Sequence, residues 1–456
     1  MTKRETFGSS FGVLAAAAGS AIGLGNIWKF PYITGENGGA AFVLVYLICI
    51  ALVGVPVMFA ELLIGRRTQS ASVGAFKALA PKQAWFLTGW FGVVAAFMIL
   101  SFYGVVAGWT LNYTYLSVTN QFAGATPEQI SKMFDSFITN GTQPIFWQMI
   151  FMVMTAFIVL SGVKDGIEKY SKIMMPMLFV IVVVLAIRGM TLDGASKGID
   201  FLLTPDFSKL TAQSVLVALG HCFFTLSLGM GAMLVYGSYT GKTQSLGKLA
   251  LQVTLADTAI ALLAGLAIFP AVFAFGVNPG QGPGLAFVTL PNVFNQMPGG
   301  YFFAIAFFVL LAVAALTSAI SLLEVLVTFL CEEFKFGRIM ATIVATLTSS
   351  VLGVLCALSM SPTSGVSKLK FPTLAGPQNF FDTMDWWSSN MLLPLGGLLV
   401  IVFAGWFMKP ADVRDELSSQ GLYAVKWFKA FQIAARFIAP IAIVVVLVAK
   451  ISGKIS

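Results

Sequence analysis

The sequence predicts an all-α integral membrane protein with eleven membrane-spanning helices, arranged as two five-helix units of opposite orientation plus one extra helix. Three observations carry this prediction: the composition, the spacing of long apolar runs, and a glycine-rich interruption found in two of them. Hydrophobic residues make up 58% of the 456 residues and charged residues 10%, whereas soluble domains are about 45–50% apolar and about 25% charged. The composition therefore favours a chain embedded in a lipid bilayer.

Long apolar runs bounded by charged or turn residues define the expected spans, because about 20 apolar residues cross a bilayer. The expected limits are residues 9–34, 40–64, 85–117, 145–162, 170–190, 212–238, 248–276, 298–331, 338–359, 388–407 and 431–450. Residues 118–144 and 277–297 are longer polar or Pro/Gly-rich stretches, which we expect to be loops. We treat residues 1–456 as a single transmembrane domain.

The basic residues predict the orientation. With the N-terminus in the cytoplasm, about two thirds of the 27 Lys and Arg residues fall in cytoplasmic segments, as the positive-inside rule requires. An odd number of spans then places the C-terminus outside the cell. The basic residues are spread over short loops rather than gathered on one face, so the net charge of +8 does not indicate a nucleic-acid partner.

The first apolar run is interrupted by Gly19-Ser20-Ala21-Ile22-Gly23-Leu24-Gly25-Asn26. Each glycine costs about 1 kcal/mol relative to alanine inside a helix, and Asn26 places an amide at membrane depth, where an unpaired polar group is expensive. Broken backbone at this depth is tolerated where it lines a cavity, and its freed carbonyls can bind a cation. The alternative is that Gly19-x-x-x-Gly23 is a helix-packing motif.

A second interruption, residues 223–231, lies in the sixth run and reads Phe-Phe-Thr-Leu-Ser-Leu-Gly-Met-Gly. The first and sixth runs are five spans apart, and this odd offset makes them point in opposite directions across the membrane. Such a pair is typical of an inverted repeat. We therefore predict repeats at about 9–190 and 212–407, each beginning with a discontinuous helix, and an extra helix at about 431–450.

Two adjacent hydroxyls in the eighth run indicate a candidate ion site. Thr317 and Ser318, together with carbonyls freed at Gly19 and Ile22, could form an all-oxygen site for a hard monovalent ion. The alternative is that both hydroxyls bond back to the preceding turn of their own helix.

The carboxylate of Asp257 in the seventh run is a functional candidate, because acids are rare inside spans. Asp257, Asn26 and Thr225 could supply side-chain oxygens to a second ion. A salt-bridged or protonated structural aspartate is the alternative. A carrier on the same scaffold that is driven by protons would use Asp257, Glu324 or His221; the other interpretation of His221 is a core residue with satisfied hydrogen bonds.

Two other function classes fit less well. A channel would show a repeated filter loop or rings of charge, and neither is visible in the sequence. An enzyme would need a nucleophile–base or metal constellation, which a chain with one histidine and four scattered cysteines does not offer. We therefore expect a transporter and not an enzyme.

The run from Gly19 to Pro31 resembles the first-helix signature of the neurotransmitter:sodium symporter family, whose members share the LeuT fold. The Gly229-Met230-Gly231 break is similar to that of bacterial members that carry hydrophobic amino acids. The resemblance implies sodium-coupled symport of hydrophobic L-amino acids, aliphatic and aromatic, across the cell membrane by alternating access. It covers essentially the whole chain and continues through residues 36–42, 109–111, 223–231, 314–318 and 382–387.

The resemblance implies a site at mid-membrane between spans 1, 3, 6 and 8. The residues it implies for substrate binding are Ala21, Gly23, Leu24, Gly25, Ile99, Tyr103, Phe224, Thr225, Ser227, Met230, Ser318 and Leu322. Those implied for sodium site 1, together with the carboxylate of the substrate, are Ala21, Asn26, Thr225 and Asp257. Those implied for sodium site 2 are Gly19, Ile22, Ala314, Thr317 and Ser318.

The resemblance also implies two gates. Lys29 and Asp385 occupy the positions of the outer gate pair, and Lys29 stands where the family usually has arginine. Lysine cannot pair bidentately with a carboxylate, so we expect a looser outer gate. Arg4 and Glu332 match the inner gate pair, with glutamate in place of the more usual aspartate.

Gly166 and Pro176 have the spacing that the family links to local unwinding and ion release at the cytoplasmic end of span 5; an ordinary proline kink is the alternative. The expected cofactor is Na⁺ at two sites. No chloride requirement is expected, because Asp257 can supply a fixed negative charge beside sodium site 1. The remaining expected partners are a small hydrophobic amino acid and the lipid bilayer.

Overall fold

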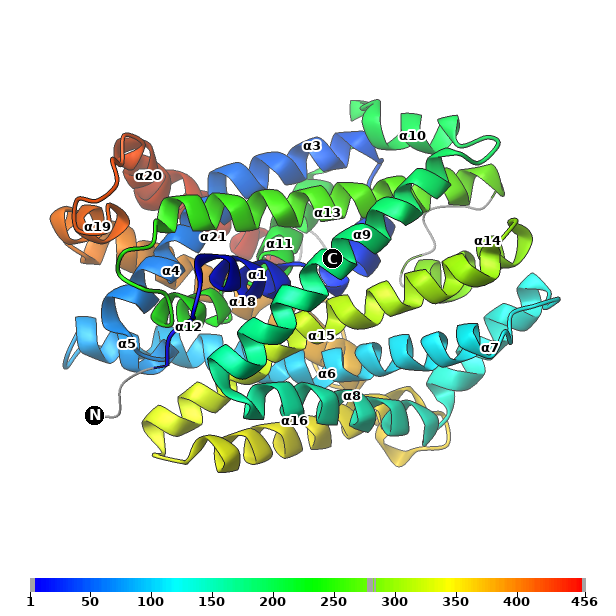
Figure 1. Cartoon of the computed structure of the whole chain (residues 1–456), viewed down its shortest axis with the longest axis horizontal. Coiled ribbons are helices and arrows are strands. Elements are labelled where there is room, and N and C mark those ends of the chain that lie inside the picture. Colours follow the sequence, from blue (N-terminus) through cyan, green and yellow to red (C-terminus); the bar gives the residue numbers. More distant parts are fainter. Residues whose placement is uncertain (1–4, 277–281, 283, 453–456) are drawn as a thin grey trace.

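The computed structural model describes residues 5–276, 282 and 284–452, and helices dominate that part of the chain (Figure 1). Elements labelled η are π-helical or 3-10 turns. The first elements are α1 (Ser10–Ala21), η1 (Gly25–Lys29), α2 (Phe30–Glu36), α3 (Ala40–Cys49), η2 (Ile50–Gly54), α4 (Val55–Thr68), α5 (Ser72–Leu79), α6 (Phe86–Val118), α7 (Pro127–Thr139), α8 (Gln143–Leu160), η3 (Val163–Glu168) and α9 (Lys169–Met190).

The second half of the chain continues in the same manner. Its elements up to residue 360 are α10 (Ser196–Leu203), η4 (Phe207–Lys209), α11 (Ala212–Thr225), α12 (Ala232–Ser238), α13 (Leu246–Ala274), η5 (Leu285–Thr289), α14 (Leu290–Gln296), α15 (Gly300–Glu333) and α16 (Arg338–Met360). The last elements are η6 (Gly365–Lys368), α17 (Phe380–Trp387), η7 (Ser388–Leu392), α18 (Leu393–Val402), η8 (Phe403–Phe407), α19 (Pro410–Leu417), α20 (Phe428–Ile433), η9 (Ala434–Ile438) and α21 (Ala439–Ile451).

The expected spans are all present as helical segments. Nine continuous segments within the described ranges are long and apolar enough to cross a membrane, and α1 with η1–α2 forms a tenth that is bent by 45°. The pair α11 and α12, separated by residues 226–231, occupies the predicted sixth span. Large apolar side chains on the outer helices, such as Phe157, Ile339 and Ile441, are more than half exposed. These features identify a multi-pass membrane protein.

The structure corrects the two predicted loops. Residues 118–144 contain α7, and residues 277–297 contain η5 and α14, although 277–281 and 283 lie outside the described residues. Helix α7 begins with a capping box, in which Thr126 and Gln129 each accept the other's backbone N–H at 3.3 and 2.8 Å. A search for long apolar runs misses such short amphipathic helices.

Two spans also begin earlier than expected. Span 5 begins at Val163 and span 10 at Phe380, rather than at 170 and 388. The expected spans were limited by charged residues, so Glu168 was placed outside span 5. In the structure, however, only 2% of the surface of Glu168 is exposed. A paired and buried carboxylate can therefore belong to a span.

The break of span 6 requires its glycines. Ser227, Gly229 and Gly231 have φ angles of 53°, 79° and 80°, which place them in the left-handed region that favours glycine. A Cβ on Gly229 would lie 2.1 Å from the carbonyl oxygen of Leu393. The backbone of the break therefore packs directly against span 10, with no room for a side chain.

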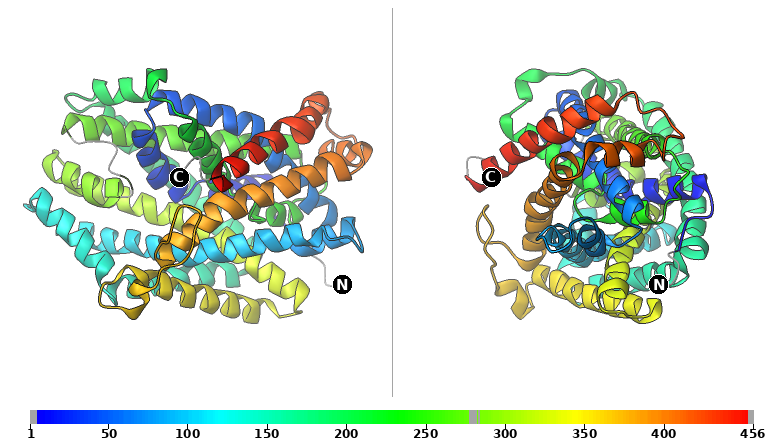
Figure 2. Two further views of the ribbon diagram at one scale, coloured as in Figure 1. Left: turned by 180° about the vertical axis from the view of Figure 1, so that it is seen from behind. Right: turned by 90° about the vertical axis from the view of Figure 1, so that its left-hand side faces the viewer.

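The long helices run side by side, and the broken helices α1 and α11–α12 lie among them near the centre of the bundle (Figures 1 and 2). One end of the bundle, here called the α5 end, carries α5, α12 and α19 (Figure 1). The opposite end, here called the α14 end, carries α7, α10 and α14. The two interruptions are thereby held at mid-depth, where the site lies.

Candidate functional site

A small cavity lies at the centre of the bundle. Its walls come from the two broken spans, α1–η1 and α11–α12, and from the long helices α6 and α15. It is lined by Ser20, Ala21, Gly23, Gly25, Ile99, Tyr103, Phe224, Ser227, Met230, Ser318 and Leu322. All the expected substrate-binding residues except Leu24 and Thr225 line it, and Ser20 is an addition that the sequence did not single out as a lining residue. The amide of Leu24 donates to the hydroxyl of Tyr103 at 3.3 Å, so it lies just behind the wall.

The cavity has a volume of about 20 Å³, which is room for roughly one water molecule. An amino-acid side chain can enter only if the walls move apart. The ring of Phe224 lines both this cavity and a larger one of about 150 Å³ towards Lys29 and Asp385. Phe224 is therefore the partition between the two spaces.

One side of the cavity is polar. The hydroxyls of Ser227 and Ser318 donate to the carbonyl of Ser20 at 2.7 and 3.0 Å. A Cβ on Gly23 would lie 2.2 Å from Ser318 Oγ and 3.0 Å from Tyr103 Oη. Any side chain at position 23 would consequently fill the polar side of the cavity.

Three of the residues expected for sodium site 1, Asn26, Thr225 and Asp257, come together around the carboxylate of Asp257, which is fully buried on α13. Asn26 Nδ2 donates to Asp257 Oδ1 at 2.8 Å, and Thr225 Oγ1 donates to the same oxygen at 3.0 Å. Tyr46, which the sequence did not flag, lies with its hydroxyl 3.5 Å from Oδ2. The side chain of Asp257 therefore faces Asn26 and Thr225.

No basic side chain within the described ranges forms a salt bridge with Asp257. The structure thus disfavours a salt-bridged structural aspartate. An ionised carboxylate buried without a charged partner is costly, and a monovalent cation at this point would offset that cost.

The expected members of sodium site 2 also converge. Thr317 Oγ1 lies 3.4 Å from the carbonyl oxygen of Ile22 and 3.0 Å from that of Ala314. Ser318 Oγ lies 3.4 Å from the carbonyl oxygen of Gly19. The bond from Thr317 Oγ1 to the carbonyl of Ala314 is the bond to the preceding turn that was considered as the alternative to an ion site. The same hydroxyl also faces the first break.

Span 5 covers sodium site 2 from one side. A Cβ on Gly19 would lie 3.2 Å from Met175 Sδ and 3.2 Å from Thr317 Cβ. Met175 is followed by Pro176, which lies inside the continuous helix α9, and Gly166 lies in η3. The predicted release segment is therefore helical in this structure rather than unwound.

Lys29 and Asp385, the residues expected to form the outer gate, lie within ion-pair distance of each other. Lys29 Nζ lies 3.7 Å from Asp385 Oδ1 and 4.5 Å from the centroid of the Phe224 ring. The cavity of about 150 Å³ that Lys29 and Asp385 line is also lined by Lys450 and His221. Lys450 could not be anticipated, because it comes from the last helix, outside the predicted repeats.

Two expectations about single residues need comment. His221 is buried, and neither ring nitrogen has a hydrogen-bond partner among the side chains and backbone of the described residues, so the expected hydrogen bonds from the protein are not found. Glu332 accepts from the backbone N–H of Ala71 with both carboxylate oxygens at 2.8 Å. Its expected partner Arg4 lies outside the described residues, so the inner gate pair stays a prediction.

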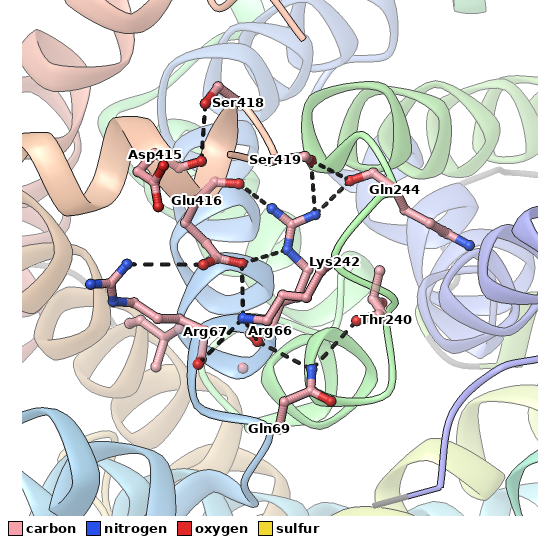
Figure 3. Close-up of polar contacts among 12 residues, drawn as sticks. Arg66, Arg67, Gln69, Thr240, Lys242, Gln244, Asp415, Glu416, Ser418 and Ser419 are labelled. Carbon is pink, nitrogen blue, oxygen red and sulfur yellow. Dashed lines mark hydrogen bonds and ion pairs between the residues drawn. The ribbon is translucent and has the colours of Figure 1, made fainter. Parts of the chain in front are cut away.

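A buried ionic cluster ties α4 to α19 at the α5 end (Figure 3). Arg66 has a fully buried side chain, and its Nε lies 2.6 Å from Glu416 Oε1. Its other nitrogens donate to Ser419 and to backbone carbonyls of Gln244 and Glu416. Lys242 approaches the same carboxylate at 3.5 Å. No local sequence pattern indicates this cluster, since its members are far apart in the chain.

A second buried pair lies at the α5 end. Arg338 Nη2 lies 2.7 Å from Glu324 Oε2, and the hydroxyl of Tyr239 donates to Glu324 Oε1 at 2.5 Å. Arg338 also donates to the carbonyl of Val159. Glu324 therefore joins spans 6, 8 and 9, and Arg338 neutralises it.

Comparisons with known proteins identify the family and the overall fold. Residues 4–135 and 126–454 match the model of the Sodium:neurotransmitter symporter family. The chain is 42% identical over 444 residues to an uncharacterized sodium-dependent transporter of Bacillus subtilis, YhdH, covering 97% of both chains. It is 36% identical over 461 residues to an uncharacterized sodium-dependent transporter of Haemophilus influenzae, covering 98% of both.

A solved structure is similar along the whole chain. The crystal structure of MhsT in complex with L-phenylalanine superposes with a TM-score of 0.91 at 47% sequence identity, covering 98% of this chain and 100% of that one. The expected all-α transporter fold is thereby confirmed, and an enzyme is excluded by the family. This chain belongs to the sodium:neurotransmitter symporter family.

Proposed function

We propose that the protein is a sodium-coupled symporter of hydrophobic L-amino acids, both aliphatic and aromatic. The observation that carries the proposal is the buried Asp257–Asn26–Thr225 cluster directly beside a cavity with one polar and one apolar side. A cation held by the cluster would lie within reach of a substrate carboxylate. Sodium and substrate would then stabilise each other's binding, which is the thermodynamic basis of coupling.

The walls of the cavity support a hydrophobic substrate. Ile99, Phe224, Met230 and Leu322 form the apolar side, opposite the hydroxyl of Tyr103. Met230 lies between two glycines in the break of span 6, and a flexible thioether can adapt to side chains of different size. We therefore expect both leucine-sized and tryptophan-sized substrates. The complex of the similar protein MhsT with L-phenylalanine is consistent with this range.

The substrate should keep its carboxylate. Position 23 is a glycine, and a Cβ there would overlap Ser318 Oγ. This position therefore offers no carboxylate that could pair with the amine of a substrate lacking its own carboxylate. The carboxylate would instead be bound by Tyr103 and by the N–H groups of the break at Leu24 and Gly25. A decarboxylated analogue would lose these contacts together with its contact to sodium site 1.

We propose two sodium ions and no chloride requirement. Site 1 would use Asp257, Asn26, Thr225 and the carbonyl of Ala21. Site 2 would use the oxygens that converge on Thr317 and Ser318. Asp257 would supply the negative charge that an anion would otherwise provide. We place the α5 end and the N-terminus in the cytoplasm and the C-terminus outside, following the basic-residue bias.

The test is uptake of labelled L-phenylalanine into proteoliposomes under a sodium gradient, a proton gradient or no gradient. We expect uptake only with sodium, strong competition by leucine and tryptophan, and little competition by tryptamine. Met230→Phe, which replaces the adaptable residue with a rigid ring, should narrow the range of accepted substrates, with the largest loss for tryptophan. Uptake driven by protons without sodium would favour the proton-driven alternative, and equal competition by tryptamine would overturn the carboxylate argument.

A further inference from the structure

Two glutamates connect the N-terminal segment to the start of span 5. The carboxylate of Glu168, the last residue of η3, accepts from the backbone N–H of Gly8 at 2.6 Å and from the hydroxyl of Ser9 at 2.8 Å. Ser9 is the N-cap of α1, and its hydroxyl oxygen accepts from the N–H of Gly12 at 3.0 Å. Glu168 therefore holds the residue that begins α1.

The reverse connection comes from Glu5. Its carboxylate Oε2 accepts from the backbone N–H of Val163 at 2.7 Å. Val163 is the first residue of η3 and follows Gly162, whose φ of 87° turns the chain into span 5. N–H groups in the first turn of a helix have no partner within that helix. Glu5 satisfies one of them, so each segment supplies a cap for the other.

The fit around both carboxylates is close. A Cβ on Gly12 would lie 2.1 Å from Glu168 Oε1, and one on Gly162 would lie 3.3 Å from Glu5 Oε2. Lys172 Nζ lies 2.5 Å from Glu168 Oε1 and balances its charge. Both carboxylates also lie at helix N-termini, where the helix dipole favours negative charge.

We propose that Glu5 and Glu168 are positioning residues that couple the release of α1 to the unwinding of the start of span 5. If span 5 unwinds, Glu168 leaves Ser9 and Gly8; if α1 moves away, Val163 loses Glu5. Span 5 also covers sodium site 2 through Met175, so the two movements together would open that site at the α5 end. This inference rests on the proposed function, because it assigns the coupled step to ion release.

Hydrogen exchange of the full-length protein in lipid nanodiscs tests the coupling, read in peptides covering residues 5–21 and 162–176. The variants are Glu5→Ala, Glu168→Ala, the double variant, and Asp165→Ala as a control. Asp165 is an exposed acid in the same turn as Glu168. We expect each single variant to raise exchange about tenfold in both peptides, the typical effect of a lost cap. Exchange in the double variant should be only slightly faster than in either single variant, and exchange in the control should match that of the wild type.

Two results would overturn the proposal: each variant loosening only the segment that it caps, with additive effects in the double variant, or no change in either peptide. If Glu168→Ala does not fold, Gly12→Ala replaces it, because the added Cβ would displace the Glu168 carboxylate from its place against α1. Exchange needs no transport, so failure of the coupling is distinguishable from failure of the proposed function, which the uptake assay reports separately.

Discussion

The two ends of the bundle close the central cavity by different means. Towards the α14 end, one aromatic ring, Phe224, and one ion pair, Lys29–Asp385, separate the cavity from a space of about 150 Å³. Towards the α5 end, buried polar contacts join α4 to α19 through Arg66 and Glu416, and the end of α12 to α15 through Tyr239 and Glu324. The barrier towards the α14 end is thin and partly exposed to solvent, whereas the barrier towards the α5 end is buried.

This difference bears on which movement is easy. Side-chain exposures of 17% for Lys29 and 38% for Asp385 allow water and salt to weaken the outer pair. Arg66 and Glu324 are fully buried, and separating either from its partner leaves a buried charge behind. A protein closed in this way should open first towards the α14 end. The α5 end should need ligand binding or local unwinding before it opens.

The largest effect is expected from breaking the buried ionic cluster around Arg66 and Glu416. Arg66→Met should lower the free energy of unfolding by about 3–5 kcal/mol, because it removes the nearest cation from the buried carboxylate of Glu416 and leaves only the more distant Lys242 and Arg67, at 3.5 and 3.9 Å. Denaturant unfolding in detergent measures it. The control is Lys77→Met, which removes an ion pair with Glu333 whose members are both partly exposed and lie outside the cluster, and for which we expect less than about 1 kcal/mol. Equal losses for both variants would contradict the distinction between buried and exposed pairs.

Transport should slow when span 5 is made a better helix. Pro176 cannot donate a hydrogen bond to the carbonyl of Lys172, and alanine restores that bond. Pro176→Ala should therefore reduce turnover by about tenfold or more while leaving substrate affinity nearly unchanged. Pro410→Ala, at the first turn of α19, is the control. Initial uptake rates and equilibrium binding separate the two quantities, and an unchanged rate would favour an ordinary kink.

The smallest effect is expected at the outer pair. Lys29→Gln should speed substrate dissociation towards the α14 end by less than about fivefold, in keeping with an exposed ion pair worth under about 1 kcal/mol. Lys29→Arg should slow dissociation, because arginine can pair bidentately. Lys209→Gln, which removes an exposed loop pair with Asp206, is the control. Dissociation slowed by Lys29→Gln would show that the pair does not close the outer side.

The membrane spans and the central site could be predicted because they depend on local signals. Apolar length marks the spans, and the two glycine-rich interruptions locate the cavity between them. The pairing of Thr317 and Ser318 with the first break was predicted from their hydroxyls and from the carbonyls that the break frees, and the structure places these oxygens within 3.4 Å of each other. Asp257 was identified because a carboxylate inside a span is costly and therefore rare.

The buried contacts of Arg66 and Glu168 could not be predicted, since they join residues far apart in the chain. Glu168 ended an apolar run in the sequence, yet it lies buried against Gly8 and Ser9. Arg66 resembled an ordinary basic loop residue, and only the position of α19 shows that it is buried. The helices α7 and α14 were missed because their amphipathic patterns are short.

The central claim is that Asp257 supplies both a sodium ligand and the charge that makes chloride unnecessary. The most direct test compares uptake of labelled L-phenylalanine in sodium gluconate and in sodium chloride, for wild type and Asp257→Asn. Wild type should transport equally in both salts. Asp257→Asn, which keeps the size of the side chain but removes its charge, should need at least about tenfold more sodium, and chloride should restore part of the loss. Strong chloride dependence in wild type would contradict the account.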